Sequence, residues 1–162
     1  MKKNLLIFTF ISIFSVAISF AHGINNSNGN MECAPGSEQN NSESAVIEIN
    51  KAQFLEKVYN YEKNPKEWVY EGSIPCIVDF YANWCGPCRT LSVTLQKLAE
   101  EYKGKIIVYK VNVDKESELS SLFGISSIPA LLWCPLGSEP FFTQGALPED
   151  LVKARIESQL LK

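Results

Sequence analysis

The chain has 162 residues, of which 46% are hydrophobic and 20% are charged. This balance is typical of one globular domain with a packed core, and it excludes a disordered or fibrous chain. The net charge is -3 and the sequence contains no basic cluster, so a nucleic-acid-binding protein is not expected.

The N-terminus has the three parts of a secretory signal peptide. Met1-Lys2-Lys3 is basic, residues 5–20 are mostly apolar and uncharged, and Ser19-Phe20-Ala21 has small residues at its first and third positions. We therefore predict a signal peptide over residues 1–21, cleavage after Ala21 and export to a periplasmic type of compartment. An uncleaved membrane anchor is the alternative, although the apolar segment is short of the roughly 20 residues that span a bilayer.

Residues 22–44 are rich in Asn, Ser, Gly and Glu and poor in large apolar side chains. Such a segment cannot bury enough surface to offset its ordering entropy, so we predict a flexible linker. It contains Cys33, one of five cysteines, and because this number is odd, at least one cysteine has no disulfide partner within the chain. An unpaired thiol is the preferred interpretation of Cys33, and a bond to another protein is the alternative.

The rest of the chain, residues 45–162, alternates predicted strands and helices. Strands are expected over 45–49, 75–81, 105–112, 129–134 and 139–144, and helices over 51–61, 87–103, 116–123 and from 148 onward. The order βαβαβαββα predicts an α/β fold with a mixed central sheet between helical layers. The segment 75–81 is apolar on both faces apart from Asp79, which is typical of a central strand covered on both sides.

Cys85 and Cys88 are separated by Gly86-Pro87 directly after this strand. Two thiols cannot complete a four-ligand zinc site, and the sequence has no second Cys-x-x-Cys or His pair. Dithiol and disulfide chemistry is therefore favoured, with no metal and no cofactor. Cysteine protease chemistry needs a histidine base, and the single histidine, His22, lies in the predicted linker.

Several motifs together resemble those of the thioredoxin family. They are Val78-Asp79-Phe80-Tyr81-Ala82, Trp84-Cys85-Gly86-Pro87-Cys88-Arg89, Lys110-Val111-Asn112-Val113-Asp114, Phe123-Gly124-Ile125 and Ile128-Pro129. Their order and spacing follow the family over residues 45–162, so the resemblance implies a thioredoxin domain there. The sequence departs from the usual pattern at Tyr81, Arg89 and Val93, which replace Trp, Lys and a helix-kinking Pro.

The resemblance implies roles for the residues around the cysteines. Cys85, just ahead of a helix whose free amides favour a thiolate, would be the nucleophile, and Cys88, more buried, the resolving thiol. Asp79 would be a buried carboxylate that helps proton transfer at Cys88, with Lys110 paired to it. An Asp that faces water at a strand end is the alternative for Asp79.

The same resemblance implies a cis peptide bond at Ile128-Pro129 opposite the cysteines. The expected docking surface for client proteins is apolar and consists of Trp84, Gly86, Pro87, Ile128, Pro129, Gly145 and Ala146. Cys76 and Cys134 match no family motif. As small side chains in apolar strands they are expected to be inert.

The predicted function is an exported thiol-disulfide oxidoreductase that reduces disulfides in client proteins. Gly-Pro between the cysteines is typical of reducing members, so a membrane thiol-electron donor is the implied partner, and we expect a monomer. A thiol reductase of cytochrome c maturation and a disulfide isomerase are alternatives with the same chemistry. A thioredoxin-fold binding or chaperone module with an idle cysteine pair is the alternative from another class.

Overall fold

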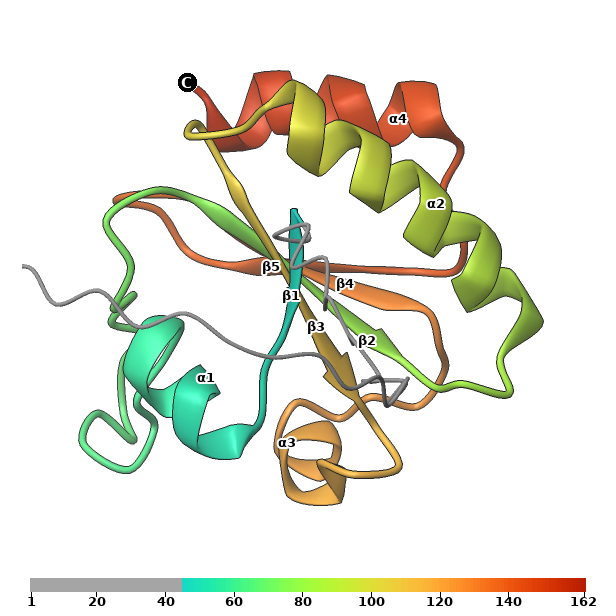
Figure 1. Cartoon of the computed structure of the whole chain (residues 1–162). Coiled ribbons are helices and arrows are strands. Elements are labelled where there is room, and N and C mark those ends of the chain that lie inside the picture. Colours follow the sequence, from blue (N-terminus) through green and yellow to red (C-terminus); the bar gives the residue numbers. More distant parts are fainter. Residues whose placement is uncertain (1–44) are drawn as a thin grey trace, which may run out of the picture. The chain divides into compact units, whose positions relative to one another are not determined.

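The computed structural model describes residues 45–162, so the predicted signal peptide, the linker and Cys33 lie outside the described residues. The helices are α1 (Lys51–Lys57), α2 (Gly86–Glu101), α3 (Ser117–Leu122) and α4 (Glu149–Arg155), which continues as a π-helical segment over Ile156–Leu160. The strands are β1 (Val46–Glu48), β2 (Cys76–Tyr81), β3 (Ile107–Asn112), β4 (Ala130–Cys134) and β5 (Phe141–Gln144). The predicted order βαβαβαββα is confirmed (Figure 1).

The five strands form one mixed sheet in the order β1-β3-β2-β4-β5. β1, β3 and β2 are parallel to one another, whereas β4 is antiparallel to β2 and to β5. β2 is the central strand, and its residues from Cys76 to Phe80 are all buried. The prediction of a central strand covered on both sides is therefore confirmed.

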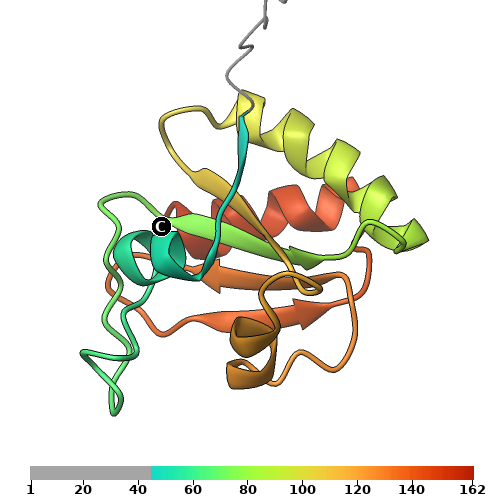
Figure 2. The same ribbon diagram turned by 60° about the horizontal axis from the view of Figure 1, so that its bottom comes forward.

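Helices cover both faces of the sheet, with α2 and α4 on one side and α1 and α3 on the other (Figures 1 and 2). Because side chains alternate along a strand, β2 contributes to two separate cores. Ile77 packs in the core that contains Leu95 of α2 and Ile156. Val78 packs in the other core, which contains Phe54 of α1. The site at the end of β2 is thus held by a strand that is fixed from both sides.

The helix predicted over residues 51–61 ends earlier, at Lys57. The chain then leaves the helical path, and Tyr59 forms an isolated bridge with Tyr70. Val58 is nevertheless fully buried beside Phe54, so the apolar pattern that suggested a longer helix reflects packing of the following residue. Among the residues from 45 to 162, no helix is both long and apolar enough to cross a membrane.

Asn50 caps the N-terminus of α1 through two reciprocal hydrogen bonds. The Gln53 amide donates to Asn50 Oδ1 at 3.0 Å, and the Asn50 amide donates to Gln53 Oε1 at 3.1 Å. Asn50→Ala should lower the free energy of unfolding by about 1 kcal/mol, because the Gln53 amide loses its acceptor. Urea denaturation would measure this. Asn50→Ser keeps a capping oxygen and should retain most of the stability, and an equal loss in both variants would contradict the capping role.

Candidate active site

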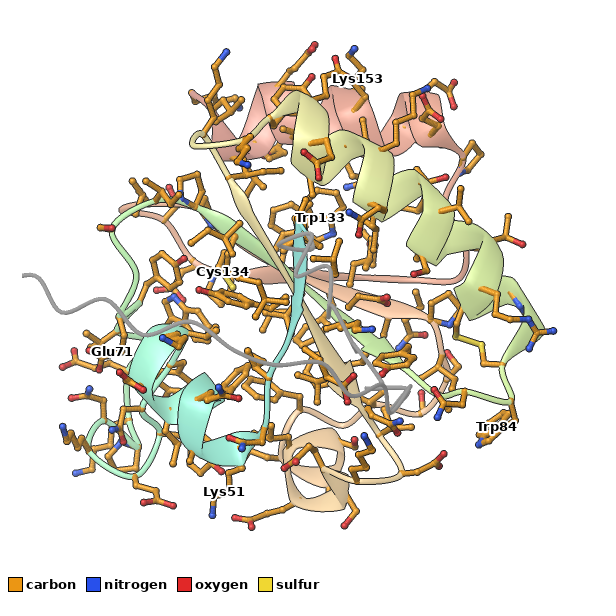
Figure 3. All side chains as sticks on the ribbon, in the orientation of Figure 1. Lys51, Glu71, Trp84, Trp133, Cys134 and Lys153 are labelled. Atoms are coloured by element: carbon orange, nitrogen blue, oxygen red, sulfur yellow. A yellow bond between two sulfur atoms is a disulfide. The ribbon has the colours of Figure 1, made fainter. Side chains whose placement is uncertain are left out.

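Cys85 and Cys88 form a disulfide at the start of α2, with their Cα atoms 5.3 Å apart. Cys85 is the N-cap residue of the helix, and Cys88 lies within its first turn. The Cys88 amide donates a hydrogen bond to Cys85 Sγ at 3.2 Å. Figure 3 shows the bonded sulfur atoms at this end of α2, with the Trp84 side chain beside them.

The helix distinguishes the two sulfur atoms electrostatically. Unpaired amides and the positive end of the helix dipole favour negative charge at the N-cap, where Cys85 Sγ already accepts the Cys88 amide. The two cysteines hardly differ in burial, since Cys85 is 4% exposed and Cys88 is 2% exposed. The order of burial agrees with the prediction, but the position at the helix terminus is the larger difference. In the reduced pair, Cys85 is the sulfur better suited to carry a thiolate.

Asp79 is a buried carboxylate in the middle of the sheet. It is 3% exposed, and within the described part of the chain its Oδ1 has no hydrogen-bond partner. Burial raises the pKa of Asp79 to about 7, although the positive charge of Lys110 acts in the opposite direction. The predicted burial is confirmed, and the alternative of an Asp that faces water is excluded. A carboxyl group in this state can exchange a proton near neutral pH.

Lys110 is adjacent to Asp79 in the β2–β3 register but is held by other groups. Its Nζ lies 3.7 Å from Glu48 Oε2 and 5.2 Å from the centre of the Tyr81 ring. The described residues contain no direct ion pair between Lys110 and Asp79, because Glu48, on the neighbouring strand β1, offers Lys110 a charged partner that remains accessible to water. The positive charge of Lys110 nevertheless acts on the Asp79 carboxyl group and opposes the rise of its pKa, so the pairing of the two residues in the reaction stays a prediction.

Glu48 is a residue of this site that the sequence analysis missed. Its Oε1 also binds Lys115 Nζ at 3.0 Å. The hydrogen bond from Lys115 is the main reason that the pKa of Glu48 is lowered, and burial opposes it. Glu48 reaches Lys110 because β1 pairs with β3, and the sequence gives no local signal for that pairing.

Trp84, the residue directly before Cys85, is an exposed large hydrophobic side chain, with 69% of its surface accessible. Its indole Nε1 donates a hydrogen bond to Asp114 Oδ2 at 3.0 Å, which fixes the ring. A hollow of about 180 Å³ lies beside the ring and is lined by Trp84, Val113, Ile125, Ser126, Ser127 and Ile128. Of these, only Trp84 and Ile128 were predicted. Val113 and Ile125 belong to the family motifs quoted above but were not assigned to the docking surface, and Ser126 and Ser127 have no signal in the sequence other than their position just before Ile128-Pro129.

The peptide bond between Ile128 and Pro129 is cis, as the resemblance implied. Ile128 packs against the small cluster that contains Cys85 and Cys88. The Pro129 carbonyl accepts a hydrogen bond from the Gly145 amide at 2.8 Å, and Gly145 has a φ of 85°, which favours glycine. The structure therefore joins the 128–129 loop to both the cysteines and Gly145.

The remaining residues of the predicted docking surface lie in the first turn of α2 and next to Gly145. Gly86 is half-buried and Pro87 is exposed in the first turn of α2, while Ala146 is exposed next to Gly145. Among the residues that the structure describes, no group of three or more His, Cys, Asp or Glu side chains is placed to hold a metal ion.

The reactive atoms of this site are two sulfur atoms that can alternate between dithiol and disulfide. In the reaction that such a pair performs, one sulfur attacks a disulfide of another molecule and forms a mixed disulfide. The second sulfur then attacks the mixed disulfide and releases the bound molecule. The fold and the site together define a thiol-disulfide oxidoreductase. A sequence model described as Thioredoxin matches residues 45–158, and the chain belongs to the thioredoxin family.

Individual relatives support the same assignment. A thioredoxin of Borreliella burgdorferi is 45% identical over 105 residues, which cover 65% of this chain and 89% of that protein. Thioredoxin 1 of Nostoc sp. is 38% identical over 59% of this chain and 89% of the relative. The crystal structure of chloroplastic thioredoxin z is similar with a TM-score of 0.57 and 29% identity, covering 69% of this chain and 91% of that one. This chain is accordingly a thioredoxin-type protein-disulfide reductase.

Proposed function

We propose that this protein is an exported thioredoxin that reduces disulfides of client proteins, with Cys85 as the attacking thiol and Cys88 as the resolving thiol. The observation that carries the proposal is the hydrogen bond from the Cys88 amide to Cys85 Sγ at the N-cap of α2. The same donor would stabilise a thiolate at Cys85, and a thiolate is the reactive form of cysteine.

The reaction has two exchange steps. The Cys85 thiolate attacks one sulfur of the client disulfide, forms a mixed disulfide and releases the other client sulfur as a thiolate. Cys88 then loses its proton and attacks Cys85 Sγ, which releases the second client thiol and forms the Cys85–Cys88 disulfide. The client gains two electrons and two protons, and this protein becomes oxidised.

Asp79 and Lys110 are proposed to manage the proton of Cys88. A carboxyl group with a pKa of about 7 can accept that proton near neutral pH and return it when the pair is reduced again. Lys110 opposes the rise of this pKa by its charge. Glu48 and Tyr81 hold the Lys110 ammonium group, so they set how strongly it acts on Asp79.

Client proteins are proposed to dock on the apolar surface around the disulfide. Its proposed members are Trp84, Gly86, Pro87, Ile128, Pro129, Gly145 and Ala146. An extended client segment could pair with the Ile128 backbone while an apolar client side chain occupies the hollow beside Trp84. Such a mode needs no fixed client sequence, because the contacts are to backbone and to apolar groups.

Export rests on the sequence of the N-terminus. We propose that residues 1–21 are removed as a signal peptide, that residues 22–44 act as a linker, and that residues 45–162 work as a monomer. Each turnover leaves the reductase oxidised, and outside the cytoplasm it needs a source of electrons to become reduced again. We therefore further propose a membrane thiol-electron donor as its partner.

A redox titration of Cys85/Cys88 combined with trapping in cells would test the proposal. We expect a potential about 150 mV more negative than that of strong disulfide oxidants, the interval that separates known thioredoxins from strongly oxidising relatives. In acid-quenched cells we expect a protein that begins at His22, is mostly reduced, and becomes oxidised when the membrane donor is deleted. A potential close to that of the oxidants, or an intact N-terminus in the cytoplasm, would overturn it.

A further inference from the structure

Cys76 and Cys134 are two free cysteines that the proposed reaction does not use. Cys76 begins β2 and Cys134 ends β4, and the two are directly opposed in the antiparallel β2–β4 register. Opposed residues place their side chains on the same face of the sheet, and both cysteines pack in the core that contains Phe54. The sequence could not indicate this contact, because 57 intervening residues hide it and only the strand register creates it.

The spacing of opposed residues is close to that of a disulfide. Their Cβ atoms are typically about 4.5–5.5 Å apart, and a disulfide needs about 3.5–4.5 Å, so bond formation requires a shift on the order of 1 Å. The two side chains already interact, since burial raises the pKa of Cys134 and the adjacent Cys76 raises it further. A bond between them would join two neighbouring strands of the sheet without rearranging the fold.

We propose that Cys76 and Cys134 form a second disulfide, between β2 and β4, when the chain folds in an oxidising compartment; its occurrence in cells rests on the proposed export. The oxidant is a small-molecule or protein disulfide. One cysteine thiolate attacks it and forms a mixed disulfide, and the other then attacks that mixed disulfide. Both thiol protons leave, and two electrons reduce the oxidant to two thiols.

The second pair cannot exchange directly with the first. β2 runs from Cys76 towards the Cys85–Cys88 disulfide, and the Cα atoms of Cys76 and Tyr81 are separated by roughly 16 Å of extended strand. Figure 3 likewise shows Cys134 far from Trp84. The second disulfide is thus a structural bond, separate from the catalytic cycle.

Tyr70 covers the buried cysteine pair. It packs against the core that contains both cysteines, and its hydroxyl group interacts with Cys76 and Cys134 and donates a hydrogen bond to the Ile74 carbonyl at 2.7 Å. On its outer side lies a groove of about 560 Å³ that is also lined by Trp68, Gly72 and Leu136. Both cysteines are fully buried beneath this cover, so an oxidant must reach them before the chain packs, and a reductant must wait for local opening.

Refolding in a glutathione buffer tests whether the bond forms. The full chain is reduced, unfolded, refolded with oxidised and reduced glutathione, quenched in acid, alkylated in denaturant and mapped by mass spectrometry. We expect chains with the Cys85–Cys88 disulfide to contain a Cys76–Cys134 peptide pair as well. Alkylated Cys76 and Cys134 in those chains, or pairing of either with Cys33, would overturn the proposal.

Reduction kinetics test the cover. In the folded, oxidised protein, dithiothreitol should reduce Cys85–Cys88 at least about 100-fold faster than Cys76–Cys134. A Cβ at Gly72 would overlap the Tyr70 hydroxyl group, so Gly72→Ala should displace the ring and speed reduction of the second bond by about tenfold. Ser73→Ala is the matched control and should change nothing. Equal reduction rates for the two bonds in the unmodified protein would contradict a buried structural bond.

A double variant separates this proposal from the proposed function. Cys76→Ala/Cys134→Ala lacks the second pair and should retain insulin-disulfide reduction, because both residues lie away from the Cys85–Cys88 site. If the unmodified protein reduces insulin normally but the mapping experiment finds no Cys76–Cys134 bond, only the proposal of a second disulfide is refuted. Absence of insulin reduction in the unmodified protein would instead refute the proposed reductase.

Discussion

Cys85→Ser is expected to reduce the rate of insulin-disulfide reduction by at least about 100-fold, to the level of the reductant alone. The serine hydroxyl group cannot become an anion at neutral pH, so the hydrogen bond from the Cys88 amide has no thiolate to stabilise. The assay follows the turbidity of precipitating insulin chains with dithiothreitol as electron source. Arg89→Lys changes an exposed neighbour on α2 while keeping its charge, and this control should remain active.

The companion variant Cys88→Ala should stop the reaction after its first step. Cys85 would still attack client disulfides, but no thiol would remain to resolve the mixed disulfide, so clients should accumulate on Cys85. Non-reducing electrophoresis of cell extracts would show these adducts, and mass spectrometry would identify the clients. Adducts on Cys85→Ala and none on Cys88→Ala would reverse the assigned roles. If the unmodified protein does not reduce insulin and its binding of clients is unaffected by Cys85→Ser, the binding-module alternative is favoured instead.

Asp79→Ala is expected to stabilise the protein at pH 8 by up to about 4 kcal/mol. The pKa of Asp79 is about 7 in the folded chain, against 3.8 for an unperturbed group, and each pKa unit corresponds to about 1.4 kcal/mol. Burial of the carboxylate is the main cause of this shift, and Oδ1 has no hydrogen-bond partner in the described part of the chain. Alanine removes the group that has to be ionised without adequate solvation.

The sign of the pH dependence follows from linkage. Between pH 4 and pH 7 the folded carboxyl group holds a proton that the unfolded chain has released, so the unmodified protein loses stability as pH rises through this range. The stabilisation by Asp79→Ala should therefore be small at pH 4 and reach its maximum above pH 7. Urea denaturation of the oxidised protein at several pH values would measure it. Asp150→Asn alters an exposed acid of α4 and is the control, and parallel curves for Asp79→Ala and the unmodified protein would contradict the shift.

Local sequence patterns predicted the elements that build the site. The apolar segment before Cys85 became the central strand β2, and the helix after Pro87 became α2 with Leu91, Leu95 and Leu98 on its buried side. These predictions succeeded because burial and helix initiation depend on residues that are close in sequence: a run of apolar residues for the strand, and a proline followed by regularly spaced leucines for the helix. Helix ends were less accurate, as at Lys57, where packing of Val58 imitates a further helical turn.

Contacts between strands that are distant in sequence could not be predicted. Glu48 meets Lys110 only because β1 pairs with β3, and Cys76 meets Cys134 only through the β2–β4 register. A shift of one residue in either register would place these side chains on opposite faces of the sheet. The family resemblance supplied the roles of Cys85 and Pro129, but it could not supply partners at positions where this chain has residues of its own.

The buried carboxylate of Asp79 also has a consequence for how the protein can change over evolutionary time. Asp79 is expected to lower the stability of the fold and is proposed to serve the reaction, so it represents a trade-off between stability and activity. Selection for heat resistance alone would favour its replacement, whereas selection for rapid regeneration of the thiols would preserve it. The balance at Asp79 therefore depends on how often the reductase must act in its compartment, rather than on how stable its fold can become.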